Sequence, residues 1–180
     1  MSVWLLLSLG ASAAWGVILF VSDRGIAQIW PPRRGGWVSA IWAWGLTTAI
    51  YVGLINAGSE AWNLLGWPAW FRWGIGGVAL TALSFWVQGR GIWDLGLGGT
   101  SGWDVGLVKT GSYAHRRHPQ YAGQIVSLIG LGLLFAAPSS LIAAAAGCAA
   151  LGYASWVEDR ALARRHGAAH ADYRKRVRFF

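Results

Sequence analysis

The sequence contains almost no cysteine and little charge. Cys148 is the single cysteine, which excludes an internal disulfide and a cysteine-rich metal site. Charged residues make up only 12% of the 180 residues, and seven residues are acidic. A soluble domain carries about a quarter charged residues, so this shortage excludes an ordinary water-soluble protein.

Apolar residues make up 55% of the chain and aromatic residues 14%, including fourteen tryptophans. The mean hydropathy is +0.42. A helix that crosses a bilayer needs roughly 20 apolar residues. Five segments lack Asp, Glu, Lys and Arg and approach this length: Val3 to Val21, Trp37 to Ala57, Trp73 to Gly89, Tyr121 to Pro138 and Ser139 to Val157. We therefore predict an all-α integral membrane helical bundle with about five transmembrane helices.

The last two segments should form a tight antiparallel hairpin. They meet at Ala137, Pro138, Ser139 and Ser140, where proline removes a backbone donor and serine favours a turn. The chain has no evident repeat or linker. We expect one domain over residues 1–180, with the N-terminal spans in residues 3–89 and a polar loop, the hairpin and a tail in residues 90–180.

The net charge of +8 is unevenly distributed. Five spans would place the loops at 22–36 and 90–120 on one side with the tail, and these hold fourteen of the fifteen basic residues. Only Arg72 would lie opposite. The positive-inside rule then predicts an inner-membrane protein with its N-terminus outside and its C-terminus in the cytoplasm, and the basic excess indicates topology rather than nucleic-acid binding.

The N-terminal apolar segment is expected to be a retained helix. Ala11, Ser12 and Ala13 imitate a signal-peptide cleavage site, but no basic region precedes them and the apolar run continues to Val21.

The polar segment from Gly106 to Tyr121 is the candidate site. His118 lies 21 residues before the expected turn at Ser139, and Glu158 lies 19 residues after it. Because both helices rise equally per residue, the hairpin should bring the two side chains to about the same depth at the membrane surface. Pro119 suits the first turn of a helix, whose free N–H groups favour an anion. Glu158 and Asp159 offer the opposite charge, for an amino group or ribose hydroxyls. Snorkelling and salt bridges at a membrane boundary are the open alternative.

Two motifs lie between Gly106 and Val177: GLVKTGSYAHRRHPQYAG in the loop and EDRALARRHGAAHADYRKRV in the tail. At this separation they resemble the C-terminal signature of the isoprenylcysteine carboxyl methyltransferase family, which is related to membrane phospholipid N-methyltransferases.

The resemblance implies a membrane methyltransferase whose cofactor, S-adenosylmethionine, is closed in by the loop and tail at the cytoplasmic face. Its acceptor would be a lipophilic small molecule or a lipid from the bilayer. The matching positions, expected to bind the cofactor, are Leu107, Val108, Tyr113, His118, Pro119, Gln120, Tyr121 and Glu158. Arg117, Tyr121 and Glu158 are the candidate catalytic residues, and no metal is expected.

One departure from the family bears on the acceptor. The isoprenylcysteine enzymes carry an arginine four residues before the cofactor glutamate that helps to hold the substrate carboxylate, and this chain has Ala154 there. An amine, a thiol or another neutral acceptor is therefore expected, although Arg117 could replace the missing arginine.

The tail is predicted to form a cytoplasmic amphipathic helix over the pocket or on the membrane. Its expected face comprises Leu162, His166, Ala169, Tyr173 and Val177. His166 and His170 are spaced like metal ligands, but no third ligand is apparent, so a solvated or tail-packing role is expected.

Two further readings concern function. The run Leu95 to Gly99 resembles a dinucleotide-binding loop only superficially, because no strand precedes it, and a flexible loop is expected, although Gly96 and Gly98 could approach the cofactor. A sterol-reductase type of membrane enzyme using NADPH and a non-catalytic lipid-binding protein are the alternatives to a methyltransferase.

Overall fold

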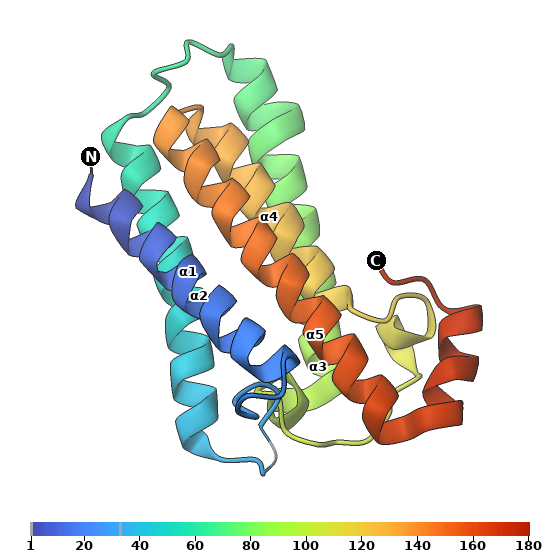
Figure 1. The fold of residues 1–180 in the computed structure, drawn as a ribbon. Helices are drawn as coiled ribbons and strands as arrows, with labels where there is room; N and C mark the ends of the chain where they lie inside the picture. Colours follow the sequence, from blue (N-terminus) through green and yellow to red (C-terminus); the bar gives the residue numbers. More distant parts are fainter. Residues whose placement is uncertain (1, 33) are drawn as a thin grey trace.

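The structure is a computed structural model that describes residues 2–32 and 34–180. Its elements are α1 (Val3–Asp23), α2 (Trp37–Glu60), the π-helical η1 (Trp70–Val78), α3 (Ala79–Thr100), the short 3-10 turn η2 (Gly111–Ala114), α4 (Pro119–Phe135) and α5 (Pro138–Arg176). Helices comprise 76% of the protein, and the described residues form no strand. The long helices lie side by side, and the tail gathers with several loops at one end of the bundle (Figure 1). The predicted all-α fold is confirmed.

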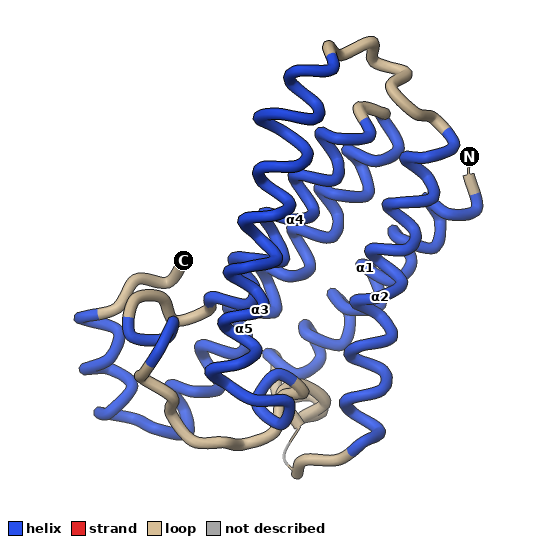
Figure 2. The backbone as a smooth tube through the Cα atoms, turned by 180° about the vertical axis from the view of Figure 1, so that it is seen from behind, coloured by secondary structure: helices blue, strands red, loops and turns tan. Residues whose placement is uncertain are grey.

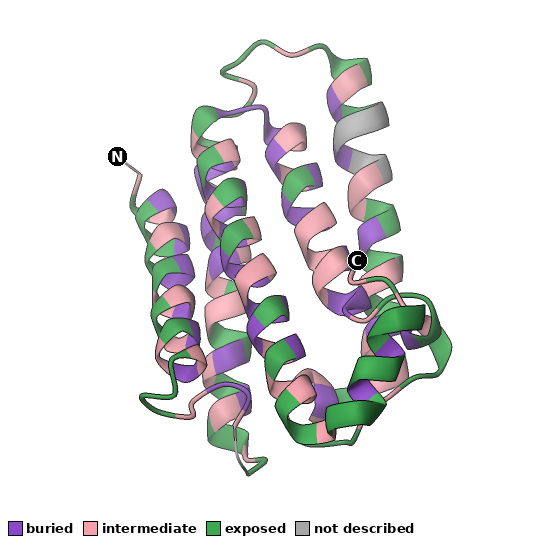
Figure 3. Ribbon diagram, turned by 45° about the vertical axis from the view of Figure 1, so that its right-hand side comes forward, coloured by how far each residue is buried: buried purple, intermediate pink, exposed green. Residues whose placement is uncertain are grey.

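Among the described residues, three helices, α1, α2 and α5, are long and apolar enough to cross a membrane, whereas α4 is apolar but has only 17 residues. The number of about five spans stays a prediction. Exposed residues run along the outer faces of the bundle (Figure 3). Many of them are large and apolar, including Val17, Phe20, Ile41, Leu83, Phe85 and Trp86. Such surfaces are unfavourable in water and suit lipid hydrocarbon. The chain is an integral membrane protein.

The third helix extends further than predicted. The expected segment Trp73 to Gly89 lies inside a helical run that begins at Trp70 and continues through α3 to Thr100. Arg90 and Asp94, one helical turn apart, form an ion pair at 3.6 Å, so these charges extend the helix instead of ending it. The flexible loop predicted at Leu95 to Gly99 is therefore wrong, although a φ of 75° at Gly96 bends the helix there.

Small residues allow α1, α2 and α5 to pack closely. A Cβ atom on Gly53 of α2 would lie 2.6 Å from the backbone nitrogen of Ser8 in α1. A Cβ atom on Gly147 of α5 would likewise lie 2.8 Å from the side chain of Ile50 in α2. The backbones approach through these positions, as in other membrane helix pairs.

The predicted hairpin between the last two segments is confirmed, but its turn comes earlier than expected. α4 ends at Phe135, Ala136 takes a left-handed φ of 48°, and α5 begins at Pro138. A proline at the first helical position loses no hydrogen bond, so Pro138 starts the second helix rather than forming the turn. The Ser140 hydroxyl donates to the Ala137 carbonyl at 2.9 Å and secures this start.

Arg72 lies near this turn, at the end of the bundle opposite the tail. Its Nε donates to the Leu134 carbonyl at 2.9 Å, and its guanidinium lies 4.2 Å from the Trp62 ring centre. These contacts bury its charge. The two ends of the bundle therefore differ in charge as the sequence predicts.

The tail turns back on itself at Gly167, where φ is 48° and ψ is −120°. The residues beyond this point fold back toward the start of α4 (Figure 2). The amphipathic face predicted for the tail is confirmed except at Ala169, since the other four of its five residues are buried or partly buried. Ala169 is exposed, whereas His170 and Tyr173 are buried.

Candidate active site

A partly open cleft lies where the loops and tail gather. Its walls come from the loop after α3, the start of α4, the polar extension of α5 and the tail. The side chains around it include Leu95, Trp103, Asp104, Leu107, Val108, Tyr113, His118, Gln120, Tyr121, Glu158, Leu162, Arg165 and Tyr173. Its lining combines apolar, aromatic and charged side chains, the mixture that small-molecule sites in proteins present.

The loop before α4 is held from two sides. On one side, the backbone N–H of Ser112 donates to Asp94 Oδ2 of α3 at 2.7 Å, and this bond lowers the pKa of Asp94. On the other side, the Tyr173 hydroxyl of the tail donates to the Tyr113 carbonyl at 2.6 Å. The loop wall of the cleft is therefore attached both to the bundle and to the tail.

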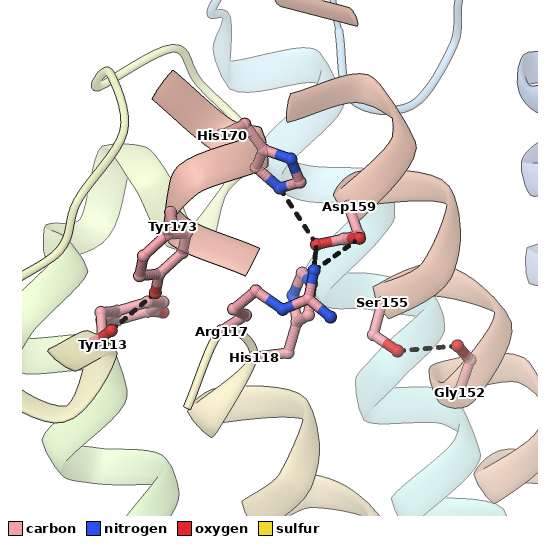
Figure 4. Close-up of polar contacts among 8 residues, drawn as sticks. All are labelled: Tyr113, Arg117, His118, Gly152, Ser155, Asp159, His170 and Tyr173. Atoms are coloured by element: carbon pink, nitrogen blue, oxygen red, sulfur yellow. Dashed lines mark hydrogen bonds and ion pairs between the residues drawn. The ribbon is translucent and has the colours of Figure 1, made fainter. Parts of the chain in front are cut away.

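Asp159 of α5 joins the loop to the tail (Figure 4). Arg117 Nη1 lies 2.9 Å from its Oδ1 and 3.0 Å from its Oδ2. His118 Nε2 lies 3.4 Å and His170 Nε2 3.2 Å from the same Oδ1. One carboxylate thus meets two residues that precede α4 and one residue beyond the break at Gly167.

The end of the chain adds a short backbone bridge to the same loop. The Arg117 N–H donates to the Arg178 carbonyl at 2.9 Å, and the His118 N–H donates to the Phe179 carbonyl at 3.2 Å. The Phe179 ring also lies against both side chains, 4.8 Å from the His118 ring centre and 5.0 Å from the Arg117 guanidinium. The end of the tail therefore covers the residues just before α4. The start of this helix is the place where the sequence predicts a site for an anion.

The surroundings of Asp159 determine its charge state. Burial raises its pKa, but the hydrogen bond from His118 and the charge of Arg117 outweigh burial, so the pKa lies below its usual value. Burial lowers the pKa of His170, so its ring is neutral near pH 7 and can donate from Nε2. Asp159 is thus an ionised carboxylate committed to internal contacts.

Glu158 and Asp159 point in different directions, and the expectation that both face a ligand is wrong for Asp159. Neighbouring residues on a helix project about 100° apart. Glu158 lines the cleft, beside the Tyr121 hydroxyl. Burial raises the pKa of Glu158.

The predicted site residues come together with one exception. Seven of the eight positions expected to bind a cofactor line the cleft: Leu107, Val108, Tyr113, His118, Gln120, Tyr121 and Glu158. Pro119 is fully buried and lies outside the lining. The three candidate catalytic residues also line the cleft, but the guanidinium of Arg117 is engaged by Asp159.

Sequence reasoning missed the outer wall of the cleft. Arg165 of α5 and Asp104 of the loop form an ion pair at 3.2 Å, and Trp103 lines the cleft beside them. Gly99 and Gly102 line it in place of the suggested Gly96 and Gly98. Nothing in the spacing of residues 99–105 indicates this contact, because it depends on how far α3 extends.

Apolar helices with a polar cleft at one end define an integral membrane protein. A family model described as Phospholipid methyltransferase matches residues 73–169, more than half of the chain. The chain therefore belongs to the phospholipid methyltransferase family, in line with the relation that the two C-terminal motifs predict. This membership supports a membrane methyltransferase that acts on lipid-type substrates. Comparison with curated proteins and with solved structures found no match.

Proposed function

We propose that the protein transfers a methyl group from S-adenosylmethionine to a lipophilic acceptor drawn from the bilayer. The observation that carries the proposal is the meeting of both C-terminal motifs in one cleft, where Tyr121 of the loop motif lies beside Glu158 of the tail motif. Family membership supports the reaction class.

The donor set of the cleft fits S-adenosylmethionine. The Glu158 carboxylate can accept hydrogen bonds from an amino group or from ribose hydroxyls. Arg165 at the rim forms a partly exposed ion pair with Asp104 and can exchange this partner for the cofactor carboxylate. Trp103 and Tyr113 offer aromatic faces for an adenine ring or a sulfonium charge. Leu107 and Val108 supply apolar contacts from the loop.

S-adenosylmethionine, when bound, supplies a methyl group activated by a sulfonium. The residues of the chain contribute position and the exclusion of water, because the bonds from Asp159 and Tyr173 hold the loop and tail around the cleft. Burial raises the pKa of Glu158 above its usual value, which makes its carboxylate a stronger base for a proton of the acceptor. Arg117 acts through Asp159 and is a positioning residue.

An amine or another neutral nucleophile is the acceptor class that these residues favour. Ala154 is completely buried in the helix core, so its position offers no charge to a carboxylate. Arg117, the candidate replacement for the missing arginine, is paired with Asp159. We further propose that the cleft faces the cytoplasm, with the N-terminus on the outside of the cell inner membrane.

Calorimetry on the protein in lipid nanodiscs tests the cofactor. We expect S-adenosylmethionine to bind and NADPH not to bind. Glu158→Gln should weaken binding by about 1 to 3 kcal/mol, the usual cost of a lost charged hydrogen-bond partner. Asp172→Asn is the matched control, since the Asp172 side chain is 63% exposed on the tail. Binding of NADPH alone would indicate the reductase alternative, and binding of neither would indicate a non-catalytic protein.

A further inference from the structure

An open groove lies between α1 and α5, which run side by side in the same direction (Figure 1). Most of the residues that line it are small or apolar: Leu9, Ser12, Ala13 and Gly16 of α1 and Ala146, Ala149, Ala150 and Tyr153 of α5. A Cβ atom on Gly16 would meet no other atom within 4 Å, so the groove has room for a guest. None of these lining residues lines the cleft, and the groove is therefore a separate surface.

An ion pair joins the two helices beyond one end of this groove. Arg160 Nη1 of α5 lies 3.2 Å from Asp23 Oδ1 of α1. Asp23 lies seven residues beyond Gly16 in the sequence, and Arg160 lies seven residues beyond Tyr153. Seven residues make about two helical turns, or about 10 Å, and return to nearly the same face of a helix. The ion pair therefore continues the line of the groove toward the end of the bundle that carries the cleft.

Two arginines at this point lie over aromatic rings on the surface. The Arg160 guanidinium lies 4.7 Å from the Trp156 ring centre, and the Arg24 guanidinium lies 5.1 Å from the Phe20 ring centre. Trp156 is 43% exposed and Phe20 is 47% exposed. Exposed aromatic rings at the end of an apolar helix are typical of the membrane–water interface. Both arginines therefore lie at the level expected for lipid phosphate groups.

Beyond the ion pair, the seam between α1 and α5 becomes a polar groove. Gln28, from the loop after α1, lines it together with Ala161, Arg164 and Arg165 of α5. Arg164 is exposed. Arg165 and Ala161 also line the cleft, so the polar groove ends beside the cleft. The seam presents an apolar groove, then two arginines, and then a polar groove with a further arginine.

We propose that this seam binds one anionic phospholipid, which is distinct from the methyl acceptor. An acyl chain lies in the apolar groove, and the phosphate contacts Arg24 and Arg160. The head group reaches Arg164 in the polar groove. The lipid would pack against α1 and α5 from outside the bundle, whereas the proposed methyl transfer takes place in the cleft.

The dimensions and charge of the seam match those of a phospholipid. Leu9 lies 14 residues, or about 21 Å, from Asp23, which exceeds the hydrocarbon depth of one leaflet, about 15 Å. A groove left unfilled within the bilayer would lose dispersion contacts, and a flexible acyl chain restores them. Asp23 offsets only one of the three guanidinium charges, so the polar end of the seam is positive and favours a lipid with a net negative charge.

A second copy of this chain is the less favourable occupant of the groove. Two copies in the same membrane orientation that pack through this groove would place Arg24 and Arg160 of one copy at the same depth as those of the other. Like charges at short distance repel one another, whereas a lipid phosphate attracts both arginines. The charge at the end of the groove therefore favours a lipid.

Native mass spectrometry of the protein in detergent tests the selectivity. We would titrate phosphatidylglycerol and phosphatidylcholine with identical acyl chains and measure the fraction of protein that carries one lipid. The parent should bind phosphatidylglycerol at least about five-fold more tightly. Arg24→Gln should lower the affinity for phosphatidylglycerol about five-fold, the effect of one arginine near a lipid surface. Arg174→Gln, which changes an exposed arginine of the tail, is the matched control and should bind like the parent.

A substitution that fills the groove tests the place of the acyl chain. Gly16→Leu should weaken the binding of both lipids by a similar factor, because the new side chain occupies the groove. Gly10→Leu is the matched control, since Gly10 of α1 also has open space but does not line the groove. Thermal melting followed by circular dichroism would show that each variant is folded.

Three results would overturn this inference. The first is equal affinity of the parent for the two lipids, and the second is unchanged phosphatidylglycerol binding by both Arg24→Gln and Gly16→Leu. The third is a dimer of the parent that excludes lipid and is lost in Gly16→Leu, which would assign the groove to a second copy of the chain.

Discussion

Arg117 and Asp159 form an ion pair in which Nη1 of the guanidinium lies 2.9 Å and 3.0 Å from the two carboxylate oxygens. The two side chains are 9% and 8% exposed, so the pair is buried. It joins the loop before α4 to the polar extension of α5, and through His170 it reaches the tail. One carboxylate therefore connects the loop, α5 and the tail beside the cleft.

Asp159→Asn should loosen the tail. The substitution leaves Arg117 as a buried charge without its counter-ion, which costs about 3 to 5 kcal/mol. We expect a lower melting temperature and faster protease cleavage within residues 167–180. Asp172→Asn, which changes an exposed acid on the tail, should behave like the parent. Equal cleavage rates for Asp159→Asn and Asp172→Asn would show that Asp159 does not hold the tail.

Acidification should release the tail through His170 and Asp159. The pKa of His170 in the folded protein is below its usual 6.5. The neutral ring therefore contributes its full share to the folding stability above pH 6.5, and this share is lost as the pH falls through the pKa of the folded protein. The pKa of Asp159 is below 3.8, so its contribution disappears at still lower pH. Stability should therefore fall from pH 7 toward pH 4, as measured by protease cleavage of the tail.

His170→Gln isolates one part of this pH dependence. Glutamine keeps a hydrogen-bond donor for Asp159 but does not titrate. The pKa of Glu158 is raised in the folded protein, so its contribution to stability increases as the pH falls toward 4.5, opposite to that of His170. This contribution is the same in the parent and the variant, so it cancels when their pH profiles are compared. The variant should lose less stability than the parent between pH 7 and pH 5. Parallel pH profiles would exclude His170 as the titrating group.

Gly167→Ala should weaken the fold-back of the tail. Gly167 combines a φ of 48° with a ψ of −120°, a turn conformation that favours glycine and costs a residue with a Cβ atom about 1 to 3 kcal/mol, and no neighbour lies within 4 Å to clash with a methyl group. Gly152→Ala is the matched control, because Gly152 also has open space but lies in regular helix. Only the first substitution should increase protease cleavage of the tail. The same increase in both variants would contradict this explanation.

Reporter fusions test the proposed orientation. A reporter at the C-terminus should signal a cytoplasmic location and one at the N-terminus an external location, because the opposite orientation would translocate fourteen basic residues. An external C-terminus would refute the orientation and move the cleft to the other side of the membrane.

The sequence predicts those parts of the fold that depend on local pattern. The charge-free run from Tyr121 to Val157 is long enough for two helices, and Pro138 marks their junction within two residues. The two C-terminal motifs identify seven residues that line the cleft, from Leu107 to Glu158. These features follow from hydropathy, from proline chemistry and from a family resemblance.

Contacts between distant residues were not predictable in this way. Asp159 resembles a ligand-facing acid in the sequence, and its commitment to Arg117, His118 and His170 depends on the reversal of the chain at Gly167. The outer wall of the cleft likewise requires Arg165 of α5 to meet Asp104 of the loop. No local spacing records such convergence.

Transfer of a labelled methyl group tests the central claim most directly. The protein in nanodiscs that contain an amine-bearing lipid would be incubated with S-adenosylmethionine labelled in its methyl group, and the lipid fraction would be analysed. We predict label on the lipid nitrogen with the parent and with Asp172→Asn, and a loss of at least about ten-fold with Glu158→Gln. Label in the lipid fraction that does not depend on the protein, or full activity of Glu158→Gln, would contradict the account.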